Sequence, residues 1–401
     1  MSVIATDAAG SFSGTPVATR ATFAVRTRLQ NIDALRGFVM VLMLLDHVRE
    51  TWFLHVPVAD PVDAHTAVPA IFLARLAVSL CAPIFVALTG LGVYLYHQHH
   101  TIEETTAYLL KRGLLLMAIE VFYLSPIYWG IAQPTFWLQV IWCIGVCMIV
   151  LAALIRLPHK ALIAIGLVIV CGHNLLDPIK LDTSNPLYLL WGELHQRGQF
   201  ELPGGFIVKF SYPILAWVGV IALGYGIGPW FTGETTAQER QKRLILLGLG
   251  MLAAFVAIRA LNVYGDKPWF VVDGDPMRTA MSFFALTKYP PSLLFLLFTL
   301  GVGALMLVWL ERLGDSGLIR ALSVFGGAPM FFYLIHLTTL RILYHIAFAI
   351  WGPTEGNLFA VSSYAWVLVW YVALIVPFYI PTAWYSRLKK RRRDIAWLKY
   401  F

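Results

Sequence analysis

Four ionisable residues stand in and beside the first long apolar stretch of the sequence: Asp33, Arg36, Asp46 and His47. An arginine can hold an anionic group, and a histidine, with a usual pKa near 6.5, can accept a proton at neutral pH. An ionisable group near the middle of a membrane costs about 2.5–3.5 kcal/mol, so several on one segment indicate a functional site.

The spacing of these residues predicts how they lie on a helix. Arg36 and His47 are eleven residues apart, which places them on the same face with an axial separation of about 16 Å. Asp33 comes one turn before Arg36 and could pair with it. The alternative is that Arg36 only extends to the membrane interface and His47 is hydrogen-bonded inside the bundle.

The composition indicates what kind of protein positions these groups. Hydrophobic residues fill 59% of 401 positions, charged residues only 13%, and the mean hydropathy is +0.72. Soluble domains carry about 25% charged residues, so we expect lipid to cover this chain. The prediction is an all-α polytopic transmembrane bundle over residues 29–386. A polar cytoplasmic N-terminal tail (1–28) would precede it, and a basic cytoplasmic C-terminal tail (387–401) would follow.

The apolar segments predict the number of spans, since a hydrocarbon core of about 30 Å needs about 20 residues per helix. About ten spans are expected, at roughly 33–53, 67–96, 108–128, 134–155, 159–176, 207–231, 241–262, 282–310, 322–350 and 362–386.

The distribution of Lys and Arg predicts the orientation. Counting alternate segments from the N-terminus, nineteen of these residues fall on one side and four on the other. This asymmetry predicts that both termini face the cytoplasm and that segments 177–206 and 263–281 face outward. The formal net charge of +8 is then explained by the topology and by contact with membrane lipid. Nucleic acid is not an expected partner.

Other residue types narrow the chemistry further. The four cysteines lie in apolar segments and read as reduced, packed thiols, and no metal is expected. No nucleotide P-loop and no GxSxG motif occurs. Further candidates within the spans are mostly basic, which suits an anionic group or a carbonyl oxygen: Arg75, Glu120, Arg259, Lys288, His336, Arg341 and His345.

The stretch Ile32–Gly37, with His47 after it, resembles the Arg-x10-His signature of transmembrane acyltransferases. Residues 28–50 resemble more closely the DUF1624 family, the bacterial relatives of heparan-α-glucosaminide N-acetyltransferase. More stretches similar to this family follow in order: Arg75 with Cys81–Gly90, Gln139–Trp142, Gly172–Asp177, Thr287–Ser292 and Phe332–His336.

The resemblance implies an enzyme that moves an acetyl group from cytoplasmic acetyl-CoA to the hydroxyl or amine of a glycan or amino-sugar acceptor outside. It also implies a bacterial inner membrane. Together with the charge pattern above, it leads us to expect three groups of site residues. The catalytic group comprises His47 as base with Asp46, Lys288 and His65. The donor-binding group comprises Arg36, Asp33, Arg75 and His336. The acceptor group comprises Asn174, His173, Tyr289 and Asp177.

One departure from the family leaves the base open. The lysosomal enzyme carries Asn where His47 stands, and its histidine follows about eleven residues later, in the next loop. The equivalent position here falls between His55 and His65, so a loop histidine is a rival to His47.

Two other functional classes fit part of the pattern. Basic groups inside a membrane could form the path of a transporter or channel for a small anion, although no matching halves are visible in the sequence. A structural or lipid-binding protein fits the composition but leaves the charges of residues 33–50 unexplained. The oligomeric state is open, a homodimer included.

Overall fold

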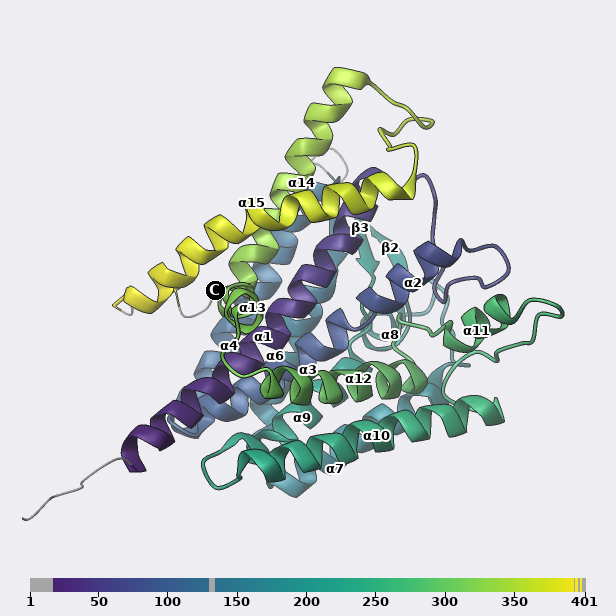
Figure 1. Cartoon of the computed structure of the whole chain (residues 1–401). Helices are drawn as coiled ribbons and strands as arrows, with labels where there is room; N and C mark the ends of the chain where they lie inside the picture. Colours follow the sequence, from purple (N-terminus) through teal and green to yellow (C-terminus); the bar gives the residue numbers. More distant parts are fainter. Residues whose placement is uncertain (1–16, 130–133, 393, 396, 399–401) are drawn as a thin grey trace, which may run out of the picture.

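The computed structural model describes residues 17–129, 134–392, 394–395 and 397–398 (Figure 1). Residues 1–16 of the predicted N-terminal tail and residues 393, 396 and 399–401 of the C-terminal tail lie outside these ranges. The chain is mostly helical, as predicted. Its long helices are α1 (Val17–Trp52), α3 (Cys81–His97), α4 (Ile102–Ile119), α6 (Val140–Leu154), α7 (His159–Gly172), α9 (Leu215–Gly226), α10 (Ala237–Leu261), α12 (Leu293–Arg312), α13 (Gly317–Gly327), α14 (Pro329–Trp351) and α15 (Tyr364–Arg391).

Shorter elements connect these helices. They are α2 (Pro69–Val78), η1 (Glu120–Leu124), α5 (Ser125–Trp129), η2 (His173–Leu176), α8 (Tyr188–Leu194), η3 (Gly228–Phe231), α11 (Pro276–Phe284) and the strands β1 (Thr135–Leu138), β2 (Gly198–Leu202) and β3 (Phe206–Phe210).

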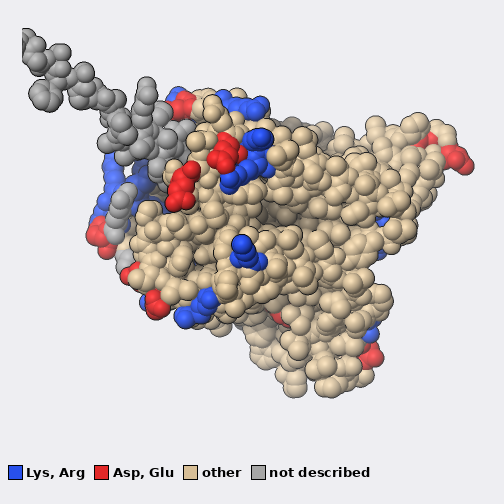
Figure 2. Space-filling model, turned by 90° about the horizontal axis from the view of Figure 1, so that it is seen from below, with Lys and Arg blue, Asp and Glu red and all other residues tan. Residues whose placement is uncertain are grey.

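Within the described residues, six helical segments are long and apolar enough to cross a membrane. They are Pro69–His97, His159–Leu176, Ala237–Leu261, Leu293–Arg312, Pro329–Trp351 and Tyr364–Arg391. The face in Figure 2 is nearly free of charged side chains except toward one end and at the outer tips, as expected of a surface that contacts lipid.

Several predicted spans are not continuous helices. The spans 134–155 and 207–231 begin with β1 and β3, because their first residues are β-branched and aromatic and pair with each other. The span 282–310 begins with an extended segment before α12, and the span 322–350 is divided where α13 ends and α14 begins. At the N-terminus, α1 starts at Val17 and so extends into the region predicted as a tail.

The start of α1 and the end of α15 lie at the same end of the molecule, which we call the terminal end (Figure 1). The segments 54–68 and 262–292 lie toward the opposite end, which we call the loop end. This arrangement is compatible with two termini on one side of a membrane.

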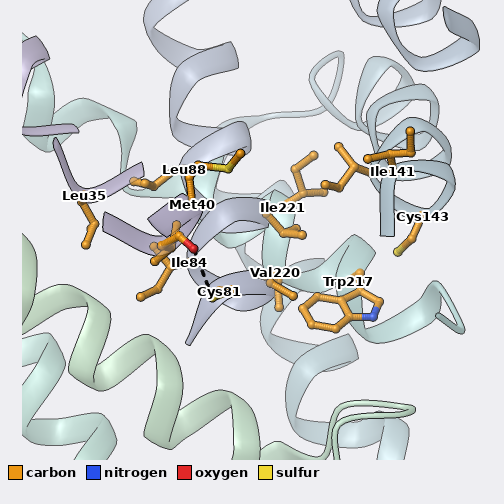
Figure 3. Packing of buried hydrophobic residues seen from close by; sticks show 14 of the residues in the cluster. Leu35, Met40, Cys81, Ile84, Leu88, Ile141, Cys143, Trp217, Val220 and Ile221 are labelled. Carbon is orange, nitrogen blue, oxygen red and sulfur yellow. Dashed lines mark hydrogen bonds between the residues drawn. The ribbon is translucent and has the colours of Figure 1, made fainter. Parts of the chain in front are cut away.

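α1 is central to the packing, with α3, α13, α14 and α15 against it. It crosses α13 at Gly37 and Gly326, where a Cβ on Gly37 would stand 1.9 Å from the carbonyl oxygen of Leu322. Small residues of this kind let two membrane helices bring their backbones together. The core between α1, α3 and α9 is apolar, and the Cys81 thiol donates to the carbonyl of Val39 at 3.2 Å (Figure 3).

The three strands form a small sheet in the order β1-β3-β2, with β1 parallel and β2 antiparallel to β3. Gly204 and Gly205, both with positive φ, make the turn between β2 and β3. Trp137 of β1 is the register partner of Lys209 of β3, so the sheet fixes these two side chains relative to each other.

Candidate active site

A cavity of about 550 Å³ lies between α1, α3, α4, α6 and α14, and the sheet and the loop-end segments complete its wall. Most of its lining is apolar, so charges within it are weakly screened. The charged and imidazole side chains on its wall are Asp46, His47, Arg49, Glu50, Asp60, Arg75, Arg112, Arg197, Lys209, Lys288 and Arg341.

His47 lies on this wall with its ring held by a second histidine. Its Nδ1 is 2.7 Å from Nε2 of the buried His336 of α14, and Nδ1 of His336 is 2.7 Å from the carbonyl oxygen of Phe332. A carbonyl can only accept, so Nδ1 of His336 carries a proton and Nε2 of the neutral ring is an acceptor. His47 therefore donates from Nδ1, and its Nε2, which has no hydrogen bond from the described residues, has a lone pair for a group bound in the cavity.

Asp46, expected to act beside His47, is instead bound by two arginines. Nη1 of Arg75 lies 2.9 and 2.8 Å from the two carboxylate oxygens, and Nε of Arg49 lies 3.2 Å from one of them. Adjacent residues on a helix diverge by about 100°, which is why the carboxylate turns toward α2 and not toward the imidazole. Arg75, expected to bind the donor, is likewise used by this ion pair.

Lys288 reaches the cavity from the extended segment before α12. Its side chain is buried, with 8% exposure, and its ammonium lies 5.0 Å from the centre of the Tyr289 ring. Asp60, in the loop after α1, accepts the backbone N–H groups of Lys288 and Tyr289, both at 3.0 Å. Burial raises the pKa of the Asp60 carboxyl, while the hydrogen bond from Lys288 and the nearby cations oppose that rise. Asp60 thus fixes the segment that presents Lys288.

Arg36 and Asp33 form the predicted ion pair, at 2.8 Å, but neither side chain lines the cavity. Nη1 of Arg36 also donates to the carbonyl of Gly326 at 3.3 Å, because the close crossing of α1 and α13 brings that carbonyl beside it. Arg36, expected on the same helix face as His47, is therefore not among the residues that line the cavity. Lys389 of α15 lies near enough to Arg36 and to the cavity-lining Arg112 for its charge to interact with both of them, and with Asp33.

His65 and His336, expected at the site, do not line the cavity. His65 is exposed and stacks on Phe270, with ring centres 4.4 Å apart. His336 is behind His47 and fully buried, so it contacts the ring of His47 and not the cavity. The rival His55 packs edge-on against Phe53 and is also outside the cavity.

The predicted acceptor residues divide between two places. Tyr289 lines the cavity, whereas His173, Asn174 and Asp177 form a separate cluster. There Asp177 accepts from Nε2 of His195 at 2.9 Å, and Asn174 accepts the backbone N–H of Leu293 at 2.8 Å. This cluster ties η2 to the start of α12, which is a structural role.

Three further candidates do not line the cavity. Arg259 is buried and donates to the backbone carbonyls of Lys267, Ser282, Phe283 and Ala285, so it fixes the loop-end segment. Glu120 accepts from the backbone at the start of α6, where a carboxylate is favourable. His345 is exposed on α14.

The cavity also contains residues that the sequence analysis did not select: Arg112, Arg197, Lys209, Trp137, Asp60 and Tyr212. Arg112 and Arg197 were counted only as topology signals, and Lys209 was assigned to a helical span. No spacing rule connects these residues, because they come from helix α4, from strands β1 and β3 with the segment after β3, and from two separate loops.

The sequence model described as heparan-alpha-glucosaminide N-acetyltransferase, catalytic, matches residues 28–265. The chain belongs to this family. The match contains His47, Asp46 and Arg75, and it ends before Lys288, Tyr289 and His336. None of the curated proteins matches the chain. Family membership and the apolar helices together indicate a membrane protein of an acetyltransferase family.

Proposed function

We propose that this protein transfers an acetyl group from acetyl-CoA, bound from the cytoplasmic side, to a sugar hydroxyl or amine on the opposite side of a bacterial inner membrane. The terminal end would face the cytoplasm, in keeping with its basic residues. The observation that carries the proposal is the free Nε2 of His47 on the wall of an apolar cavity, in a chain of this family.

The proposed reaction needs a base and a donor to the developing oxyanion. The acceptor oxygen or nitrogen attacks the thioester carbon while Nε2 of His47 takes its proton, and the carbon–sulfur bond breaks to release CoA. Lys288 supports the oxyanion, because its buried ammonium points into the same cavity. His336 holds the ring of His47 in the required tautomer.

The donor fits the terminal end of the cavity. CoA carries phosphates, and the cavity-lining Arg112 at this end has Lys389 close to it, with the Arg36–Asp33 ion pair next to Lys389. Nε of Arg112 is buried and has no hydrogen-bond partner among the described residues, which leaves it available to a phosphate oxygen.

The test is stabilisation of the full-length protein by acetyl-CoA. At 100 times Kd a ligand adds about 2.7 kcal/mol to the free energy of unfolding, which raises Tm. Arg112→Ala should lose most of that rise, whereas Lys160→Ala, an exposed control outside the cavity, should keep it. A melting curve that neither acetyl-CoA nor CoA moves would refute the proposal.

A second function, transport of a small anion, is favoured by one observation: seven Lys or Arg and three Asp or Glu line the cavity among the described residues. It predicts the reverse ranking, with acetate or another small anion stabilising the protein more than acetyl-CoA does.

A further inference from the structure

Tyr333 of α14 lies on the cavity wall beside His47. Its ring meets the His47 ring edge-on, with the two centres 6.1 Å apart, and it meets the ring of His336 in the same way at 5.7 Å. The residue lines the cavity and is only 6% exposed. Contacts with two imidazoles therefore hold this phenol next to the proposed base.

The hydroxyl of Tyr333 has no hydrogen bond to any of the described residues. Two other phenols of the cavity are paired, since the hydroxyl of Tyr289 donates to that of Tyr212 at 3.1 Å. Buried polar groups ordinarily have a partner, so an unpaired hydroxyl on a cavity wall is available to a bound molecule. A phenol, with a usual pKa of about 10, keeps its proton at neutral pH and can donate it to a hydrogen bond.

A second donor, Lys288, approaches the same part of the cavity from the segment before α12. Its ammonium is near enough to the ring of His47 for their charges to interact. It lies 5.0 Å from the centre of the Tyr289 ring and 5.9 Å from that of Tyr212. The hydroxyl of Tyr333 is near enough to the hydroxyls of the same two tyrosines to interact with them. One charged and one neutral donor therefore lie around the same pair of phenols, close to His47.

We propose that Tyr333 is a catalytic residue of the acetyl transfer, and that its hydroxyl donates to the thioester carbonyl oxygen together with Lys288. The acceptor oxygen or nitrogen bonds to the carbonyl carbon while Nε2 of His47 takes its proton. The carbonyl electron pair moves onto oxygen, where the two donors stabilise the charge. When the carbonyl forms again, the carbon–sulfur bond breaks and the departing sulfur takes the proton from His47. The inference rests on the proposed function and adds a second donor to its oxyanion.

The chemistry of the two side chains separates their roles. Nε2 of His47 has a lone pair and can accept a proton at neutral pH, whereas the phenol of Tyr333 holds its proton and can only donate a hydrogen bond there. A neutral hydroxyl also adds no charge to the apolar cavity before the substrate binds. Tyr333 is thus suited to the oxyanion and not to the role of base.

The first measurement compares Tyr333→Phe with the native full-length protein, using labelled acetyl-CoA with glucosamine as acceptor. Phenylalanine keeps the ring and its contacts with both imidazoles, so only the hydroxyl is lost. We expect kcat to fall by about 100-fold or more, as for the loss of one oxyanion donor, with the KM for acetyl-CoA changed by less than about twofold. Hydrolysis of acetyl-CoA by the same proteins should show the same loss, because water attacks the same carbonyl whether or not glucosamine is the right acceptor.

Tyr385→Phe is the matched control. Tyr385 of α15 is also buried, its hydroxyl has no partner among the described residues, and its ring stacks on Phe331 with centres 4.3 Å apart. It does not line the cavity, so loss of the same hydroxyl there should leave kcat unchanged.

A second measurement places 3,5-difluorotyrosine at position 333 by amber suppression, which keeps the hydroxyl and so also serves if the phenylalanine variant folds poorly. A donor must hold its proton, so activity should fall at high pH as the phenol ionises. The fluorinated phenol is more acidic, and the fall should therefore begin at a lower pH than in the native protein. The same replacement at position 385 should leave the pH profile in place.

A kcat for Tyr333→Phe within about twofold of the native value, or a pH profile that the fluorinated residue does not move, would overturn the inference and leave acetyl transfer intact. A native protein that neither transfers nor hydrolyses the acetyl group, and that acetyl-CoA does not stabilise, would overturn the proposed function and the inference with it. Loss of kcat together with a shifted pH profile supports both.

Discussion

Replacing His336 with leucine tests whether the second histidine sets the tautomer of His47. Leucine is apolar and fills much of the same space, but it offers no acceptor to Nδ1 of His47, now 2.7 Å from Nε2 of His336. The variant thus leaves a buried N–H without a partner. His47 can escape by moving its proton to Nε2, and that removes the lone pair from the cavity.

The magnitude follows from the cost of an unsatisfied buried donor, about 1–3 kcal/mol. If that cost favours the wrong tautomer, the active fraction of His47 falls accordingly, and each 1.36 kcal/mol reduces the rate about tenfold. We therefore expect kcat to fall by about 5- to 150-fold, with little change in the KM for acetyl-CoA. His336→Gln, whose amide oxygen can accept the same bond, should recover part of the loss.

The assay is steady-state acetyl transfer by purified variants whose melting curves show a folded protein. His345→Leu on the same helix is the matched control, since His345 is exposed and outside the cavity. A kcat for His336→Leu within twofold of the native value would refute the tautomer argument, and so would an equal loss in His336→Gln.

Three other changes test the supports of the site. Asp60→Asn keeps one acceptor oxygen for two backbone N–H groups and should lower kcat several-fold by loosening Lys288, with acetyl-CoA stabilisation retained in thermal melts. Gly37→Ala places a Cβ against α13 and should lower stability by about 1–3 kcal/mol or more, whereas Gly250→Ala, with open space around it, should not lower Tm. Burial raises the pKa of Asp177, but hydrogen bonds from His195 and Asn174 outweigh it and lower the pKa overall. Its contribution to stability should therefore be present above pH about 4 and lost as pH falls below that, and Asp177→Asn should flatten this part of a Tm–pH curve.

The helical architecture could be predicted because length and hydropathy determine which segments a membrane accepts. The positions at which those helical segments are interrupted could not be predicted. β1 and β3 are four and five residues long, too short to show an alternating pattern inside an apolar run, and their pairing joins positions 72 residues apart. The same limit applies to the extended segment before α12, which is held by Asp60 and Asp266 from two other loops.

From the sequence we selected cavity residues that one helix carries. We did not select most of those that separate segments bring to the cavity. Asp46 and His47 lie on the cavity as expected, since both belong to α1. Helix periodicity predicts that Arg36 and His47 share a face, but it does not show which of them lines the cavity. In the structure Arg36 binds Asp33 and the carbonyl of Gly326. Arg197 and Lys209 give no local signal at all, and only the sheet brings them near Tyr289 and Trp137.

The positions of the cations suggest how acetyl transfer could avoid moving charge through an apolar interior. In the proposed reaction the phosphates of the donor stay with Arg112 at the terminal end. Only a neutral thioester and a neutral nucleophile need to meet beside His47, so no ion incurs the cost of crossing the hydrocarbon core. The free lone pair on Nε2 of His47 is suited to that meeting, because it accepts a proton without first having to release one.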